Sequence, residues 1–97
     1  MDHKQEKIEA LYSLILKLQT PEDCHKLFDD LCTVKEIEKM AERIQAAKLL
    51  LEGKTYQQVM AQSNISSATL SRVSRCVQYG DGYRRLLNQS EDTGSPS

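Results

Sequence analysis

The sequence contains no tryptophan and few other aromatic residues, which limits the core that a single chain can build. Among its 97 residues, the aromatic side chains are one phenylalanine and four tyrosines. A chain of this length has room for one domain. Such a domain buries only about 60–65% of the surface that its unfolded chain exposes. The core is therefore expected to be modest, and a second subunit would help to complete it.

Proline and glycine are also scarce, and their scarcity favours helices. Pro21 is the only proline before Pro96, and the four glycines all follow Glu52. Long proline-free stretches rich in Leu, Ala, Glu, Lys and Gln favour the α-helix. No segment shows a convincing strand alternation. The predicted fold class is all-α.

Long apolar runs are absent as well. No segment approaches the about 20 apolar residues that a membrane helix needs. The N-terminus is polar and charged up to Glu9, unlike a secretory signal. We therefore expect a cytoplasmic protein associated with the bacterial nucleoid and with no membrane partner.

The sequence offers little material for a metal site or for catalysis. The three cysteines, Cys24, Cys32 and Cys76, form no pairing pattern and, even with His3 and His25, match no closed zinc spacing. No nucleophile, base and orienting group stand together in any segment, and there is no glycine-rich phosphate loop. We expect no metal, no cofactor and no enzymatic activity.

Helix signals divide the chain into six segments. Apolar residues at helical spacing predict a first helix over residues 5–19. Thr20 and Pro21 then suit the cap and first position of a second helix, which ends near Cys32. Thr33 and Glu36 form a capping box before a third helix that runs to about Leu51. The inward residues expected on that third helix are Ile37, Met40, Ala41, Ile44, Ala47 and Leu51.

Shorter helices follow Gly53, which suits the left-handed position just past a helix end. One is expected from Thr55 or Tyr56 to about Ser63, and another, capped by Ser66, over residues 67–79. Asn64 is expected in a turn with left-handed backbone. The last helix is expected over residues 83–88. The domain would then span 1–89, with a polar, disordered tail over 90–97.

Charge is distributed unevenly along the chain. The net charge is −1, yet no Asp or Glu lies between Glu52 and Asp81. Lys54, Arg72 and Arg75 all lie within this stretch. A locally positive segment is suited to contact with a polyanion such as DNA.

The same stretch has the pattern of a helix-turn-helix. Residues 55–77 read as two short helices joined by a short turn. Its expected core residues are Val59, Met60, Ile65, Leu70 and Val73.

The exposed face of the second short helix carries residue types that are suited to contact with DNA. Short side chains at its start, Ser67, Ala68 and Thr69, allow entry into a major groove about 12 Å wide. Hydroxyl groups there can bond to base edges or phosphates. Further along the same face, Arg72 and Arg75 can contact the DNA backbone or reach guanine.

Residues 49–83 resemble the tryptophan repressor superfamily, and within it the YerC/YecD-like branch of repressor-like proteins without an assigned effector. The resemblance rests on the Leu-Glu-Gly run at 51–53, the Ser-Ala-Thr-Leu-Ser-Arg-Val run at 67–73 and the Tyr-Gly-Asp-Gly-Tyr break at 79–83. It extends in helix order and length over residues 5–88. Met60, where many helix-turn-helix units have Ala, and Asn64, where they have Gly, depart from the pattern.

The resemblance implies a six-helix fold and an intertwined homodimer. The helices over residues 5–51 would dimerise, and residues 55–79 would form the helix-turn-helix. Such a dimer binds double-stranded DNA at a palindromic operator with half-sites about one turn apart. Carried over to this chain, the base-contacting positions are Ser67, Ala68 and Thr69. The positions that match or neighbour phosphate contacts are Lys54, Tyr56, Gln57, Ser71 and Arg72.

The corepressor positions differ from those of the tryptophan repressor. Thr33, Arg43 and Arg72 align with residues that hold tryptophan there. Val73, however, stands where the repressor has a glycine that makes room for the indole. Because a branched side chain would occupy that space, we predict that tryptophan is not the corepressor. Arg43 and Arg72 could still bind the carboxylate of a different effector.

The resulting hypothesis is a DNA-binding transcriptional regulator, most simply a repressor. One alternative is a regulator that responds to another small molecule. The other is a protein-interaction module that keeps the fold without reading DNA, which the near-zero net charge permits. Steep weakening of binding by salt would separate a DNA reader from that module.

Overall fold

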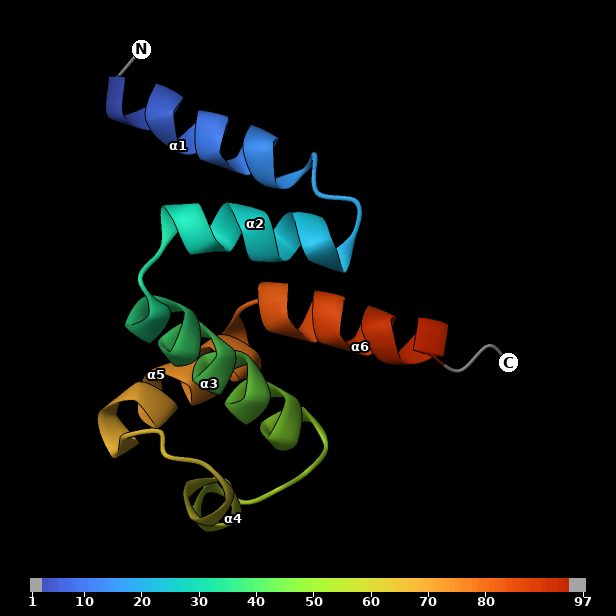
Figure 1. The fold of residues 1–97 in the computed structure, drawn as a ribbon. Helices are drawn as coiled ribbons and strands as arrows, with labels where there is room; N and C mark the ends of the chain where they lie inside the picture. Colours follow the sequence, from blue (N-terminus) through green and yellow to red (C-terminus); the bar gives the residue numbers. More distant parts are fainter. Residues whose placement is uncertain (1–2, 95–97) are drawn as a thin grey trace. The chain divides into compact units, whose positions relative to one another are not determined.

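The computed structural model describes residues 3–94, with side chains over 3–88, and within this range it contains helices and no strand (Figure 1). The helices are α1 (His3–Ile15), α2 (Pro21–Leu31), α3 (Val34–Leu51), α4 (Tyr56–Gln62), α5 (Ser67–Tyr79) and α6 (Gly82–Gly94). The prediction of an all-α, six-helix chain is confirmed. The chain divides into two compact units, Met1–Val34 and Lys35–Ser97.

In the first unit, the connection between α1 and α2 is fixed by local hydrogen bonds. The Thr20 side chain accepts a hydrogen bond from the Asp23 amide at 3.0 Å, and the Asp23 carboxylate accepts one from the Gln19 amide at 3.1 Å. These two bonds use backbone donors that would otherwise be unpaired near the start of α2. Pro21 occupies the start of the helix, as predicted. The first helix ends at Ile15, before the expected end at Gln19, and tight turns complete the segment.

The first unit has apolar faces but no buried residue on either helix. Its exposed large apolar side chains are Leu11, Tyr12, Leu14, Leu16, Leu31 and Val34. The helical spacing of residues 5–19 therefore produces an apolar face that its own unit leaves open to solvent.

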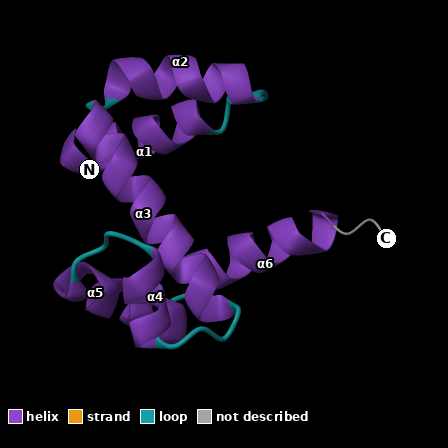
Figure 2. Cartoon of the chain, turned by 60° about the horizontal axis from the view of Figure 1, so that its bottom comes forward, coloured by secondary structure: helices purple, strands orange, loops and turns teal. Residues whose placement is uncertain are grey.

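The second unit contains the hydrophobic core. Its buried residues are Ala46, Ala47, Val59, Ile65, Leu70, Val73 and Val77. They come from α3, α4, α5 and the turn between α4 and α5, and Figures 1 and 2 show α4 and α5 beside the C-terminal half of α3. Because the α3 contribution is two alanines, both 0% exposed, the neighbouring helices can approach α3 closely.

The end of α3 has the predicted glycine geometry. Gly53 has a φ of 97°, in the left-handed region. The Lys54 amide donates to the Leu49 carbonyl and the Gly53 amide to the Leu50 carbonyl, both at 3.0 Å. This pair of bonds is a Schellman motif, which satisfies carbonyls that the helix itself leaves unpaired. The chain can then turn sharply toward α4.

The structure differs from the sequence expectation at the turn between α4 and α5. Among the described residues, no residue other than glycine has a positive φ, so the left-handed backbone predicted for Asn64 is wrong. Ser63 and Ser66 are both extended, with ψ values of 166° and 156°. The chain reverses through these extended residues, and a left-handed residue is not needed.

Two further expectations differ from the structure. On α3, Ala47 is buried as predicted, but Ala41 is exposed and Ile44 is 50% exposed. The last helix, α6, begins one residue before Tyr83 and continues past the expected end at Asn88 to Gly94. No proline or glycine lies between Asn88 and Gly94 to end it sooner. Residues 95–97 of the expected disordered tail lie outside the described residues.

Gly80 provides a test of the α5–α6 connection. A Cβ at Gly80 would lie 2.7 Å from the Cys76 carbonyl oxygen, whereas a Cβ at Gly82 would meet nothing within 4 Å. We expect Gly80→Ala to lower the free energy of unfolding by about 1–3 kcal/mol because the helix backbone must move. Gly82→Ala should stay within about 0.5 kcal/mol of the parent protein. Chemical denaturation measures both values, and equal losses would contradict this assignment.

Candidate nucleic-acid interface

The helix-turn-helix is formed by α4, the turn over residues 63–66 and α5. A capping box begins α4: the Thr55 hydroxyl accepts from the Gln58 amide at 3.1 Å, and the Gln58 side chain accepts from the Thr55 amide at 2.8 Å. This box was not part of the sequence prediction, although its signal, Thr followed three residues later by Gln, is present. At the other end, the Ser63 hydroxyl donates to the Val59 carbonyl at 2.8 Å.

The core expected for this motif is largely confirmed. Val59, Ile65, Leu70 and Val73 are all buried. Met60 was expected with them but is 39% exposed. Val59 and Met60 are adjacent on a short helix and point in different directions, so only one of the two can face α3 fully.

The start of α5 is capped by Ser66. Its hydroxyl oxygen accepts from the Thr69 amide at 3.2 Å, and its hydroxyl group lies 3.0 Å from the Thr69 hydroxyl, to which it donates. Ser67 and Ala68 are exposed, and Thr69 is half-buried. The residues predicted to contact bases therefore lie together in the first turn of α5, and the rotamer of Thr69 is restrained by the cap.

The two faces of α5 are chemically distinct. Leu70, Val73 and Val77 are buried against the core. Ser71, Arg72 and Arg75, which were predicted to contact DNA, are exposed. The exposed side of α5 thus carries hydroxyls at its start and two guanidinium groups farther along. An anion is favoured near that start because the helix dipole is positive there.

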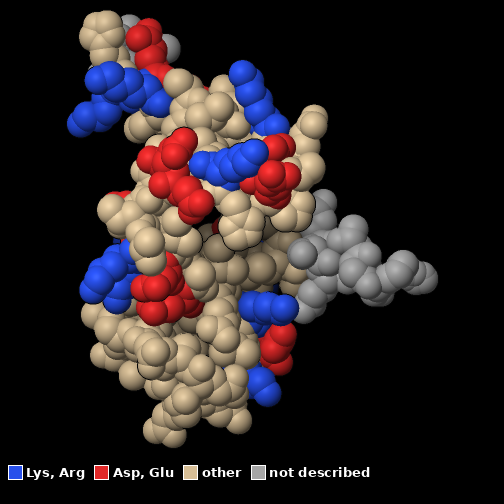
Figure 3. Space-filling model, in the orientation of Figure 1, with Lys and Arg blue, Asp and Glu red and all other residues tan. Residues whose placement is uncertain are grey.

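The predicted phosphate-contacting residues at the start of α4 are also accessible. Lys54, Tyr56 and Gln57 are all exposed, Tyr56 to 40%. Over α4, at the bottom of Figure 3, the visible face carries no acidic side chain, in agreement with the absence of Asp and Glu between Glu52 and Asp81. The motif therefore presents accessible donors with no carboxylate among them.

The four effector-pocket candidates differ in their burial. Val73 is 1% exposed and belongs to the same core cluster as Ala46 and Ala47. Arg43 on α3 is half-buried and Arg72 on α5 is exposed, while Thr33 belongs to the first unit. The Val73 side chain is packed among core residues and does not line an open cavity.

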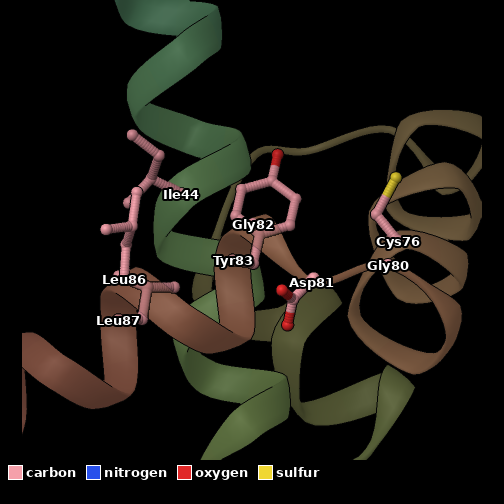
Figure 4. Close-up of a pocket in the computed structure, with 8 residues that line it drawn as sticks. All are labelled: Ile44, Cys76, Gly80, Asp81, Gly82, Tyr83, Leu86 and Leu87. Carbon is pink, nitrogen blue, oxygen red and sulfur yellow. The ribbon is translucent and has the colours of Figure 1, made fainter.

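An apolar groove of about 480 Å³ lies elsewhere in the second unit (Figure 4). Its lining residues are Ile44, Cys76, Gly80, Asp81, Gly82, Tyr83, Leu86 and Leu87. Ile44 from α3 lies beside Leu86 from α6 in Figure 4, and Leu86 is 64% exposed. This groove was not predicted from the sequence, although the apolar spacing of residues 83, 86 and 87 is a signal for it.

The described part of the chain has neither a metal-binding cluster nor a membrane-spanning helix. Among the described side chains, over residues 3–88, no group of three or more His, Cys, Asp and Glu is placed to bind a metal ion. No helix within residues 3–94 has the length and apolar character needed to cross a bilayer. The three cysteines are unpaired thiols, with Cys24 exposed and Cys32 and Cys76 half-buried.

The helix order and the helix-turn-helix agree with known proteins. A family model described as Trp repressor protein matches residues 6–91. The chain belongs to the Trp repressor family. The resemblance seen in the sequence is thereby confirmed for nearly the whole chain.

Relatives of this Trp repressor family member are similar to it in sequence, and two solved structures share its helical fold. The chain is 40% identical to the uncharacterized protein YerC of Bacillus subtilis (strain 168) over 92 residues, covering 94% of this chain and 88% of YerC. A crystal structure of a candidate Trp repressor from Staphylococcus aureus superposes with a TM-score of 0.84 at 37% identity, covering 94% of this chain and 95% of that one. A TrpR-like protein from Eubacterium eligens ATCC 27750 gives 0.83 at 34% identity, with 89% and 90% covered.

The Ser66 cap can be tested by its effect on stability. We expect Ser66→Ala to lower the free energy of unfolding by about 1 kcal/mol, because the Thr69 amide loses its acceptor. Ser66→Asp should retain most of that stability, since Asp caps equally well. Denaturant titration measures both, with Ser67→Ala as a control at the neighbouring exposed serine. A Ser66→Ala protein as stable as the parent would show that the cap contributes little.

Proposed function

We propose that this protein is a sequence-specific transcriptional regulator, most simply a repressor, that binds a palindromic operator as a homodimer. Membership of the Trp repressor family suggests a DNA-binding regulator. The observation that carries the proposal is the division of α5 into a buried face and an exposed face of hydroxyls and guanidinium groups. The protein acts at the nucleoid in the cytoplasm and needs no catalytic activity for this role.

Recognition begins at the first turn of α5. Ser67, Ala68 and Thr69 are small enough for the helix start to lie deep in the major groove, where each base pair presents a distinct pattern of donors and acceptors. Arg72 and Arg75, one and two turns along the same helix, supply charge for phosphates or a bidentate contact to guanine. Lys54, Tyr56, Gln57 and Ser71 add backbone contacts that fix the register of the protein on DNA.

The dimer is supported by apolar surface that one chain leaves uncovered. The first unit exposes Leu11, Tyr12 and Leu14 and buries no residue of its own helices. The second unit has an open apolar groove. Surfaces of this kind are stabilised by burial in a partner, at about 25 cal/mol for each Å² of apolar area. Two copies of this chain would supply such burial for both units and present two α5 helices to DNA.

Tryptophan is not part of the proposed mechanism. The side chain of Val73 is packed among core residues, at the position where the resemblance places the glycine that makes room for the indole. Because that space holds protein atoms, no ligand is needed to fill it. Binding to DNA without a corepressor follows from this arrangement.

Selection from a random palindromic DNA library at low salt, without added ligand, tests the proposal. We expect one palindrome to be enriched. Thr69→Ala should weaken binding to it by about five- to 150-fold, because losing the fit to one base pair costs about 1–3 kcal/mol. Arg72→Ala should also weaken binding. Lys17→Ala, which removes a charge outside the helix-turn-helix sequence, serves as the control.

Other outcomes would redirect the assignment. Enrichment only after cell metabolites are added would indicate a regulator with a small-molecule effector. Failure to enrich any sequence under both conditions would contradict DNA reading and favour a protein-interaction module with this fold.

A separate prediction concerns the corepressor. Titration of the protein with L-tryptophan in a calorimeter should give no binding heat up to millimolar ligand, because Val73 leaves no room for the indole. A tryptophan-responsive repressor measured in parallel provides the positive control. Binding with micromolar affinity would overturn the claim that the pocket is filled.

A further inference from the structure

The C-terminal end of α5 is held by a residue from the next helix. The last four carbonyls of a helix have no partner within it. In α5, the Cys76 carbonyl accepts from the Gly80 amide at 2.8 Å, which continues the helical pattern by one residue. The Val77 carbonyl accepts from Nη2 of Arg84 at 2.6 Å, and Arg84 lies in the first turn of α6. One guanidinium group therefore joins the two helices.

This bond also supplies the charge that the end of α5 lacks. The last turn of α5 contains no basic residue, although a cation there is favoured by the negative end of the helix dipole. The Arg84 guanidinium occupies that place from another element. A hydrogen bond from a charged donor is shorter and stronger than one between neutral groups.

The neighbouring arginine provides a natural comparison. Nη1 of Arg85 lies 3.8 Å from Oδ2 of Asp81, the residue just before α6. Both side chains are more than 70% exposed. Exposed pairs of this kind contribute little. Two adjacent arginines with the same charge thus have different contacts: Arg84 bonds to the end of α5, whereas Arg85 pairs with the residue that precedes α6.

Packing restrains the same connection. Tyr83 and Leu87 of α6 pack against the core that contains Val73 and Val77. Gly80 allows the chain to pass close to α5, since a Cβ there would lie 2.7 Å from the Cys76 oxygen. The start of α6 is therefore fixed to the end of α5 by apolar contact, by close backbone approach and by the Arg84 hydrogen bond.

We propose that Arg84 is a positioning residue that fixes the direction of the recognition helix α5 relative to α6. This inference rests on the proposed function, in which α5 reads DNA and two copies act together. In that dimer, the second copy would cover the open groove that Leu86 of α6 lines, so the angle between α6 and α5 would set the separation of the two recognition helices. Arg84 thereby determines which spacing of operator half-sites is accepted.

The first test requires no DNA. Amide hydrogen exchange is measured over residues 76–80 in the parent protein and in the Arg84→Ala and Arg85→Ala variants. We expect exchange at the end of α5 to accelerate about tenfold in Arg84→Ala and to be unchanged in Arg85→Ala, since only the first loses the bond to Val77. Arg84→Lys, which keeps the charge and a donor, should fall between them. If Arg84→Ala is poorly folded, Arg84→Lys carries the comparison.

The second test uses DNA with altered spacing. Affinity is measured for the selected palindrome and for the same palindrome with one base pair inserted between its half-sites. We expect the parent protein and Arg85→Ala to prefer the original spacing by the same ratio, although Arg85→Ala binds both DNAs more weakly through its lost charge. In Arg84→Ala the ratio should fall at least about threefold, because the direction of α5 loses one of its restraints. A purely structural role would weaken both DNAs and leave the ratio unchanged.

These outcomes distinguish failure of the Arg84 inference from failure of the proposed function. Unchanged exchange in Arg84→Ala would overturn the inference whether or not the protein binds DNA. Faster exchange with an unchanged spacing ratio would reduce Arg84 to a helix cap and overturn its positioning role. If the parent protein binds no DNA, the proposed function fails and the operator role of Arg84 fails with it. The exchange measurement still shows in that case whether Arg84 holds α5.

Discussion

The burial of two alanines of α3 against α4 and α5 is the contact on which the rest of the second unit depends. Ala46 and Ala47 are fully buried and present only methyl groups, so Leu70 and Val73 of α5 can pack closely against α3. A larger side chain at either alanine would push the recognition helix away, since overpacking a dense core costs about 1–3 kcal/mol. The exposed face of α5 follows from this contact, because the residues opposite Leu70 and Val73 must point to solvent.

Local hydrogen bonds then define where each element begins and ends. The Schellman motif at Gly53 ends α3, and the capping box at Thr55 begins α4. The two ends of α5 are held differently: Ser66 caps its start within the motif, and Arg84 reaches its last turn from α6. In the proposed function, a recognition helix restrained at both ends would lose little further conformational freedom on binding DNA, which favours affinity.

Sequence reasoning was accurate where the signal is local. Thr20 with Pro21, Gly53 and Ser66 each mark a boundary through the chemistry of one or two residues, and each is found where it was expected. Apart from Met60, the residues that apolar spacing placed in the helix-turn-helix core are buried. Asn64 shows the limit of this reasoning, because a residue that tolerates left-handed backbone does not have to adopt it.

Features that depend on tertiary contacts were not predictable in the same way. Helical spacing predicted that Met60 and Ile44 face the core, but both are exposed. The neighbouring helices decide which of several apolar residues on a helix become buried. The bond from Arg84 to the Val77 carbonyl joins residues seven positions apart across a helix break, and no spacing rule indicates it. The residues predicted to contact DNA came partly from the exposed face of the second short helix and partly from the resemblance, and all but the half-buried Thr69 are exposed.

The central claim is that the exposed face of α5 binds DNA through phosphates and bases. The most direct test is the dissociation constant of the protein for its selected palindrome, measured from low to high salt beside a scrambled DNA of equal length. We predict that the logarithm of the association constant falls linearly with the logarithm of salt, by about 0.9 for each phosphate neutralised. The palindrome should remain preferred at each salt concentration. An affinity that does not change with salt, or equal binding of the two DNAs, would contradict this account.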